Sequence, residues 1–544
     1  MIFDYKYKGF SNVQNQSSST RMSFAPDASR KPTWFNGQLN NKLPFREAIS
    51  ALHSIVTSDL RYQPRDTTEY KAWLESQEEV WLAEFMQQKA ADEQEFESLR
   101  EQLKSIEAQQ RTLMGPFYSA QRKYFQYLYK KNRDWWFVLD PVISVHPDEI
   151  SFECFSLDES SYGRLACSHN VFDSLGDFSC GTTNIDYSAA LYNEFQKIRD
   201  YKTTELVIDP EGFSVETEAE ESYREVKIDL PDSWVRGFLQ VSSAMTMDGY
   251  SFSLHPMDLH NLLFHLKRKK EKQGPRSLRF LLKPGQPVAV SIDPWNTMIT
   301  CPRSEYRGNQ EAEIRIWGRR RLLTLERLLP IAKSIDVTLL GTGMPSFWNV
   351  QMPEMTFTLG LSGWTANDWS SSSNFDLLAP RAEVDGETVL KVTDVLRDKW
   401  TATSQEISQV SAVSSAQALA ALSIATQEGK VIYDANKKLW RSRELSGDAL
   451  PLSELRYANP REEKAAQFFN IGAVAFQTTC SDDKRTLSGE VKDNGKVYSS
   501  TAVIDSDERL VDGTCTCNFY SQNKFMKGPC EHILALRVAE ARRF

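Results

Sequence analysis

The stretch CTCNFYSQNKFMKGPCEH, from Cys515 to His532, decides how this part of the chain folds. It holds three of the eight cysteines and one of the seven histidines, spaced as C-x-C, twelve residues, then C-x-H. Zinc prefers four tetrahedral ligands drawn from thiolates and imidazoles, and two close pairs joined by a loop can supply them. We therefore predict that Cys515, Cys517, Cys530 and His532 hold one structural zinc ion.

The residues around the two ligand pairs favour this geometry. Cys515 and Cys517 stand two apart at the end of a predicted strand, so their side chains share one face. Cys530 and His532 follow a Gly-Pro turn at the start of a predicted helix, HILALRVAEARR, whose N-terminal amides favour thiolates. The alternatives explain less. A Cys515–Cys517 disulfide would be strained, a Cys–His nucleophile leaves two cysteines unused, and a catalytic zinc keeps one position open.

The loop between the two ligand pairs is the predicted contact surface of this module. Two lysines and three aromatic residues share it: Phe519, Tyr520, Lys524, Phe525 and Lys527. Aromatic side chains beside cations are typical of surfaces that bind proteins or nucleic acid. We expect a partner to bind here.

The chain before the zinc motif predicts a small module and a linker. A helix near REEKAAQFF leads into several short strands, and the DNG between TLSGEV and KVYSSTAVID is a strong hairpin turn. Residues 460–544 therefore form the predicted zinc-finger module, and residues 446–459 form the linker that precedes it.

Residues 388–445 predict three helices followed by a hairpin, which is the order of a winged-helix domain. The third helix would read DNA, yet residues 411–429 contain no Lys or Arg and one Glu, whereas base and phosphate contacts need donors. The hairpin does carry cations that suit a phosphate contact, among them Lys437, Lys438 and Arg441. We favour a protein-contact or purely structural role for this domain over DNA binding.

The rest of the chain predicts a multidomain α+β protein. The segments are an irregular arm (1–45), a long helical hairpin (46–133), an α+β domain (134–273) and a β-rich domain with one helix (274–387). That helix covers RRRLLTLERLLPIAKS, whose first arginines oppose the helix dipole and therefore indicate pairing with carboxylates or an anion. The acidic segment HPDEISFE (146–153) is interpreted as a turn leading into a strand.

Charge and hydropathy exclude several classes of partner. The formal charge of −9 over 544 residues gives no global attraction to nucleic acid or anionic membranes, so such binding would need a local patch. The first residues, MIFDYKYKGF, lack the apolar core of a signal peptide, and no run reaches the ~18 apolar residues that span a bilayer. We expect a cytoplasmic protein with no membrane partner. Because we find no nucleophile–base or phosphate-loop motif, we do not expect an enzyme.

Two sets of segments resemble a known family. TCTC and CEHILAL are similar to the SWIM zinc finger, although a Lys is more usual there where Glu531 stands. FREAISALHSIVTSDLRYQP, WGRRRLLTLERLLPIAKSIDVTLLGTGMPSFW and FTLGLSGWTANDWS resemble the large bacterial SWIM proteins. Those proteins are generally encoded beside a MoxR-type AAA+ ATPase and a von Willebrand A domain protein. The resemblance implies membership of such a system and identifies no activity.

The combined expectation is a zinc-binding scaffold or adaptor that mediates protein–protein interaction. Its candidate partners are the MoxR-type AAA+ ATPase and the von Willebrand A domain protein. The alternative is a nucleic-acid-binding protein that uses the zinc finger and the winged helix together. The acidic balance, the uncharged third helix and Glu531 favour the first hypothesis.

Overall fold

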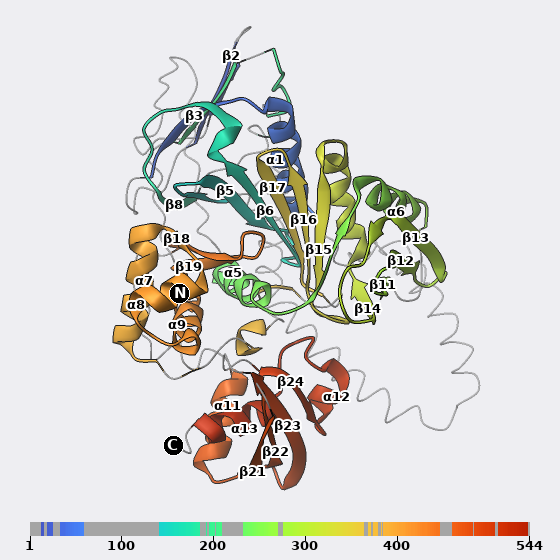
Figure 1. Ribbon diagram of the computed structural model, residues 1–544, viewed down its shortest axis with the longest axis vertical. Helices are drawn as coiled ribbons and strands as arrows, with labels where there is room; N and C mark the ends of the chain where they lie inside the picture. Colours follow the sequence, from blue (N-terminus) through green and yellow to red (C-terminus); the bar gives the residue numbers. More distant parts are fainter. Residues whose placement is uncertain are drawn as a thin grey trace, which may run out of the picture. The chain divides into compact units, whose positions relative to one another are not determined.

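The structure is a computed structural model that describes most of the chain outside residues 59–140 (Figure 1). The described ranges are 12–15, 19–24, 33–58, 141–184, 192, 195–201, 203–208, 232–269, 276–363, 368–370, 374–378, 382, 384–445, 460–481, 484–505 and 510–541. Beyond Ser58, the predicted helical hairpin of residues 46–133 lies outside them, as does the whole linker 446–459.

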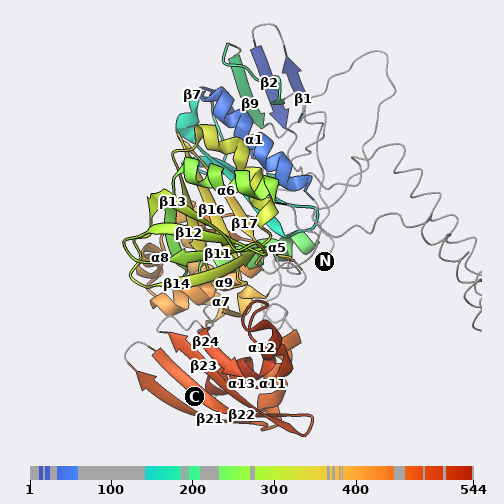
Figure 2. The same ribbon diagram turned by 90° about the vertical axis from the view of Figure 1, so that its right-hand side faces the viewer.

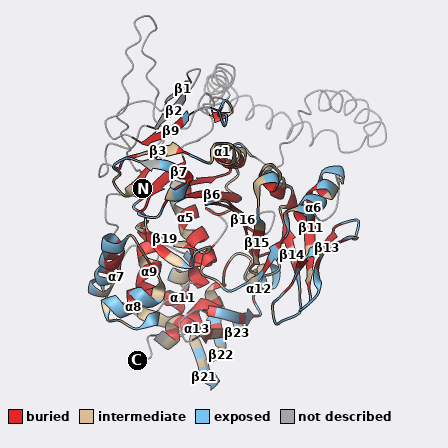
Figure 3. Cartoon of the chain, turned by 45° about the horizontal axis from the view of Figure 1, so that its top comes forward, coloured by how far each residue is buried: buried red, intermediate tan, exposed pale blue. Residues whose placement is uncertain are grey.

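Eight antiparallel strands form the central sheet, in the order β10-β15-β16-β17-β6-β5-β4-β8. They span Tyr250–Leu254 (β10), Ser334–Leu339 (β15), Ser346–Met352 (β16), Met355–Leu361 (β17), Ser161–Ser168 (β6), Glu149–Phe155 (β5), Val142–Val145 (β4) and Gly181–Asn184 (β8). Inner strands such as β6 and β16 are buried on both faces (Figure 3), which explains why their residues do not alternate between apolar and polar. The sheet joins strands from both predicted domains, 134–273 and 274–387, into one layer.

Helix α1 (Lys42–Val56) packs against β5 and β6 of the central sheet. Its buried residues recur at helical spacing, so one apolar face meets the sheet. Gly163 of β6 permits the close approach, because a Cβ there would lie 2.6 Å from Cδ1 of Ile55.

A five-stranded sheet has the order β1-β2-β9-β3-β7. Its strands span Asn12–Asn15 (β1), Ser19–Phe24 (β2), Thr203–Ile208 (β9), Phe35–Leu39 (β3) and Phe172–Leu175 (β7). Residues 1–45 were expected to be irregular, but β2 and β3 both pair with β9. Local composition does not predict a strand whose pairing partner lies so far along the chain.

A four-stranded sheet follows the order β13-β12-β11-β14. Its strands span Thr297–Glu305 (β13), Pro287–Ile292 (β12), Ser277–Leu282 (β11) and Ala312–Trp317 (β14), and α6 (Pro256–Arg268) packs against β13. The one predicted helix of this region is a 3-10 helix, η3 (Arg319–Ile331). Arg321 in its first turn lies 3.4 Å from Asp158, in agreement with the predicted carboxylate pairing.

Residues 386–442 contain three helices and a hairpin in the predicted order. They are α7 (Gly386–Lys399), α8 (Ser404–Ser411), α9 (Ser415–Gln427), β19 (Val431–Asp434) and β20 (Leu439–Ser442), with β18 (Thr401–Ala402) paired to β20. Helix α9 is buried along most of its length and contacts α5 (Asp232–Met245), α7, α8 and β19, as a core helix does. Within the described ranges no single helix is long and apolar enough to cross a membrane; α8 and α9 meet that criterion only when taken together, across a bend of 106°.

Residues 460–541 form the C-terminal module (Figure 2). Four antiparallel strands lie in the order β21 (Val474–Ser481), β22 (Lys484–Asp493), β23 (Lys496–Asp505) and β24 (Leu510–Cys515), and both α11 (Pro460–Asn470) and α13 (Glu531–Ala541) contact this sheet. The predicted turn joins β22 to β23, with φ of 49° at Asn494 and 76° at Gly495. Positive φ at both central residues defines the type I′ turn that Asn-Gly favours.

Candidate metal centre

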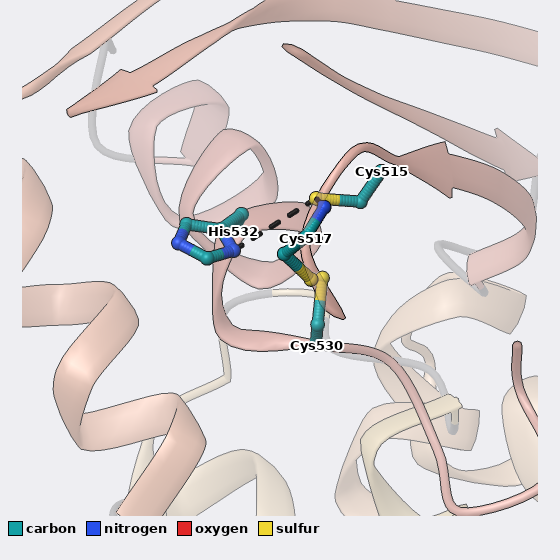
Figure 4. Close-up of side chains that lie close together, drawn as sticks. All are labelled: Cys515, Cys517, Cys530 and His532. Atoms are coloured by element: carbon teal, nitrogen blue, oxygen red, sulfur yellow. Dashed lines mark hydrogen bonds between the residues drawn. The ribbon is translucent and has the colours of Figure 1, made fainter. Parts of the chain in front are cut away.

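The four predicted ligands converge where β24 ends and α13 begins (Figure 4). Cys515 is the last residue of β24, and Cys517 is the N-cap of α12 (Asn518–Asn523), where its sulfur accepts the amide of Tyr520 at 3.3 Å. Cys530 immediately precedes α13, and His532 lies in the first turn of that helix. One strand end and two helix starts therefore set the spacing of the ligand pairs.

The arrangement of the ligand atoms fits zinc. All four lie within 4.8 Å of one another, and Cys515 Sγ is 3.8 Å from Nδ1 of His532. Zinc bonds of ~2.3 Å to sulfur and ~2.0 Å to nitrogen place neighbouring ligands of a tetrahedron about 3.5–3.8 Å apart. All four side chains are buried, Cys530 completely. The cluster is able to hold one zinc ion with four protein ligands.

Hydrogen bonds around the sulfur of Cys515 favour the thiolate form that zinc requires. Ser500 Oγ donates to Cys515 Sγ at 3.2 Å, and the amide nitrogen of Cys517 lies 3.4 Å from the same sulfur. A hydrogen bond from the Cys530 thiol, aided by these donors, lowers the pKa of Cys515 to about 3. Donating that bond, together with burial, raises the pKa of Cys530. Because buried thiolates this close repel one another, a divalent cation among them relieves an unfavourable charge.

His532 is held by two aromatic rings and faces a carboxylate. Its ring stacks on Phe468, with centroids 5.6 Å apart and 12° between the planes, and lies 4.3 Å from the ring of Tyr498. Nδ1 faces Cys515, and on the other side of the ring Nε2 lies 3.5 Å from Asp493 Oδ2. Asp493 immediately precedes the Asn-Gly turn. The sequence predicted a hairpin at this segment, but it did not predict a contact with a metal-ligating side chain.

A second group with metal-ligating side chains, Asp493, Glu531 and His532, adjoins the cysteine cluster. Lys464 of α11 binds both carboxylates, with Nζ 2.9 Å from Asp493 Oδ2 and 3.0 Å from Glu531 Oε1. Burial acts to raise the pKa of each carboxyl, but the ammonium group and, for Glu531, a backbone amide outweigh burial and lower both pKa values. We interpret this group as an ion-pair cluster, because the lysine already supplies its cation.

The loop predicted as the contact surface packs partly on its own module. Arg461 of α11 lies over the ring of Phe519 at 4.2 Å and donates to the carbonyl of Lys527 at 2.8 Å. Tyr520 is buried, and its hydroxyl donates to a carbonyl of β24 at 2.7 Å. Arg461 lies more than fifty positions before the loop, so this contact was not predictable from local sequence patterns.

The other residues of the loop either face solvent or pack against the chain. Lys524 is exposed, with Nζ 4.8 Å from the ring of Tyr520, whereas Phe525 is half-buried against that ring. Gly528, at φ +80°, lies so close to Asn374 that a Cβ would be 2.4 Å from its carbonyl oxygen. Of the five predicted contact residues, Lys524 is the one that is exposed; Phe519, Phe525 and Lys527 are half-buried and Tyr520 is buried.

The three hairpin cations that were predicted to contact a partner differ in exposure and in the carboxylates that they bind. Arg441 is completely buried, with Nη1 2.8 Å from Asp148 Oδ1. Lys437 Nζ lies 2.8 Å from Asp148 and 2.7 Å from Glu149. Lys438 is exposed in the turn, at φ 54°. The acidic segment HPDEISFE is therefore a turn into β5, as expected, and its carboxylates also hold the β19–β20 hairpin.

Comparison with known proteins identifies part of the C-terminal module. Residues 497–536 match the SWIM zinc finger family, a range that includes all four ligands. No curated protein sequence matches the chain. Among solved structures, similarity is found to the proliferating cellular nuclear antigen of Entamoeba histolytica (11% identity, 41% of this chain and 88% of that chain, TM-score 0.29). It is also found to A. fulgidus PCNA bound to the C-terminal region of FEN-1 (9% identity, 42% and 91%, TM-score 0.29). These scores are too low to indicate a shared fold.

Proposed function

We propose that this chain is a zinc-binding scaffold or adaptor that mediates protein–protein interaction, with zinc as a structural ion. The observation that carries the proposal is the closed ligand set of the SWIM zinc finger. Four buried side chains fill the tetrahedron, so no coordination position remains for water or substrate. A zinc ion enclosed in this way stabilises a fold and does not activate a nucleophile. We therefore propose neither a catalytic role for this centre nor an enzymatic activity for the chain.

The alternative, a nucleic-acid-binding protein, has less support. In a winged-helix domain α9 would be the reading helix, but it is buried among other elements and carries no Lys or Arg. In the hairpin, Arg441 and Lys437 bind carboxylates of the chain itself. Binding to DNA needs exposed donors and a local excess of positive charge. The exposed Lys438 and Lys524 are the observation that keeps this candidate in consideration.

For the partners, we propose a MoxR-type AAA+ ATPase and a von Willebrand A domain protein in a bacterial cytoplasmic system. The support is the resemblance of the longer segments to large bacterial SWIM proteins, outside the residues 497–536 that match the zinc finger. On this proposal, the exposed part of the loop between the two ligand pairs, around Lys524, contacts a partner protein. The zinc ion keeps that loop in one conformation.

Metal analysis of the purified chain tests the zinc centre. We expect about one zinc per chain, and loss of that zinc in Cys517→Ser and in His532→Ala, because each variant removes one of four ligands. Cys480→Ser is the matched control, since it changes an exposed cysteine of β21 in the same module. Zinc retained in both ligand variants, or lost equally from the control, would contradict the assignment.

Affinity purification of the tagged chain from its own cells tests the partners. We expect an AAA+ ATPase or a von Willebrand A domain protein to be recovered with the wild-type chain and to be depleted with Cys517→Ser. Recovery of nucleic acid, with an affinity that falls steeply as salt rises, and of neither protein, would instead favour the alternative.

A further inference from the structure

The buried imidazole of His532 has one ring nitrogen directed at the cysteines and one directed away from them. Nδ1 lies 3.8 Å from Cys515 Sγ, as a zinc ligand would. His532 is 2% exposed, and within the described part of the chain Nε2 has no hydrogen-bond partner. A buried N–H without an acceptor is unfavourable, so this nitrogen needs a partner.

Asp493 offers the acceptor. Its Oδ2 lies 3.5 Å from Nε2, and a movement of about 0.7 Å would produce the ~2.8 Å of a charge-assisted hydrogen bond. The imidazole is confined on its faces, because Phe468 stacks on it and the ring of Tyr498 lies 4.3 Å away. The ring plane that these contacts set directs Nδ1 to the sulfurs and Nε2 to the carboxylate.

Asp493 is itself held in place from two directions. It pairs with Lys496 across the type I′ turn, which fixes its backbone. Lys464 Nζ binds the same Oδ2 at 2.9 Å and also binds Glu531, the residue before His532, at 3.0 Å. A carboxylate oxygen can accept more than one hydrogen bond, so the lysine and the histidine can share it. The lysine therefore links α11, the hairpin turn and the start of α13.

We propose that Asp493, held by Lys464, is a positioning residue of the metal centre whose carboxylate accepts the Nε2–H of His532. Histidines that ligate metals commonly donate their other ring N–H to a carboxylate, which fixes the tautomer, orients the ring and makes the ligand more basic. Asp493 thereby keeps the Nδ1 lone pair available for zinc. The proposal depends on the metal centre and is independent of the adaptor role.

Competition for zinc between the full-length chain and a chromophoric chelator tests this role. We expect Asp493→Asn to weaken zinc affinity about 10- to 100-fold, the usual effect of losing such a partner. The matched control is Glu490→Gln, which removes an exposed carboxylate from the same strand. Its affinity should stay within about twofold of wild type, because an exposed charge has little effect.

Lys464→Met provides a second test that leaves the turn sequence unaltered, in case Asp493→Asn impairs folding. We expect its zinc affinity to fall about 3- to 10-fold, since the carboxylate keeps its charge but loses its anchor. The two substitutions should also be non-additive in the double variant, because they act through one contact.

Cobalt(II) substitution separates positioning from a general loss of stability. The visible absorption of bound cobalt should shift in Asp493→Asn, because the orientation and basicity of the His532 imidazole change. It should remain unchanged in Glu490→Gln. The proposal is overturned by an unshifted cobalt spectrum, or by affinities of Asp493→Asn and Lys464→Met equal to that of the control. A wild-type chain that binds no zinc would overturn the metal centre itself.

Discussion

Replacing Arg441 by Met should destabilise the β19–β20 hairpin and leave the zinc centre intact. The guanidinium is completely buried and lies 2.8 Å from Asp148, 3.1 Å from Glu149 and 2.9 Å from Asp434. Removing one partner of a buried ion pair leaves an uncompensated charge and costs about 3–5 kcal/mol. Because Lys437 and Arg164 still neutralise part of this charge, we expect a loss of about 3 kcal/mol, at the lower end of that range.

The free energy of unfolding that is lost in Arg441→Met should depend on pH. Burial acts to raise the pKa of Asp148, Glu149 and Asp434, but nearby cations outweigh burial and lower all three pKa values: Arg441 and Lys437 at Asp148, and Arg164 followed by Arg441 at Glu149 and Asp434. A carboxyl whose pKa falls on folding adds stability that is fully present above its unfolded pKa of roughly 4, and that is lost as the pH drops through the folded value. The effect of Arg441→Met should therefore be full at neutral pH and should shrink as the pH falls below about 4.

Hydrogen exchange at the amides of β19 and β20 measures this loss. A local cost of about 3 kcal/mol predicts exchange that is faster by about a hundredfold at neutral pH. Lys437→Met is the matched control, because it removes a partly exposed cation from two of the same three carboxylates and should cost only about 0–1 kcal/mol. Exchange in Arg441→Met no faster than in this control would refute the buried ion-pair argument, as would an effect that grows on acidification.

Two further substitutions test the packing of the module and of α9. Gly528→Ala should destabilise the C-terminal module by about 1–3 kcal/mol, because it combines a positive φ with a clash at Asn374. Gly472→Ala, at φ +66° with open space around it, isolates the cost of positive φ, so equal thermal shifts in both variants would exclude the clash. Ala421→Lys should unfold residues 386–442, because the side chain is completely buried, whereas the exposed Gln409→Lys should be tolerated. A folded Ala421→Lys chain with stronger DNA binding in a salt titration would instead identify α9 as a reading helix.

Short-range patterns predicted the zinc centre because each ligand pair is set by a local element. Cys515 and Cys517 depend on a strand end and the helix start that directly follows it, and Cys530 and His532 depend on one helix start, so spacing along the chain was sufficient. The Asn-Gly turn and the order of α7, α8, α9 and the hairpin were predictable for the same reason. Capping boxes at Thr403 and at Ser414, which begin α8 and α9, are likewise local signals.

Contacts between distant segments were not predictable from such patterns. The sequence placed Arg441 and Lys437 among the contacts to a partner, yet both bind Asp148, which lies nearly three hundred positions earlier. The supposedly irregular residues 1–45 contribute strands to a sheet completed by β9. In both cases two segments that lie far apart in the sequence come into contact only when the tertiary fold brings them together. The sequence shows which side chains are charged, but it does not show whether a charged side chain will face solvent or pair with a distant residue.

By itself, therefore, the sequence determined the ligand set Cys515, Cys517, Cys530 and His532 and the presence of a SWIM zinc finger around it. The tertiary structure decided what surrounds that site: the carboxylate beside His532, the lysine that holds it, and the arginine that covers Phe519. Ligand spacing is a property of a few consecutive residues, so it is visible in one dimension. The second layer of contacts comes from α11 and the β22–β23 turn, and only folding brings these to the metal-binding end of α13.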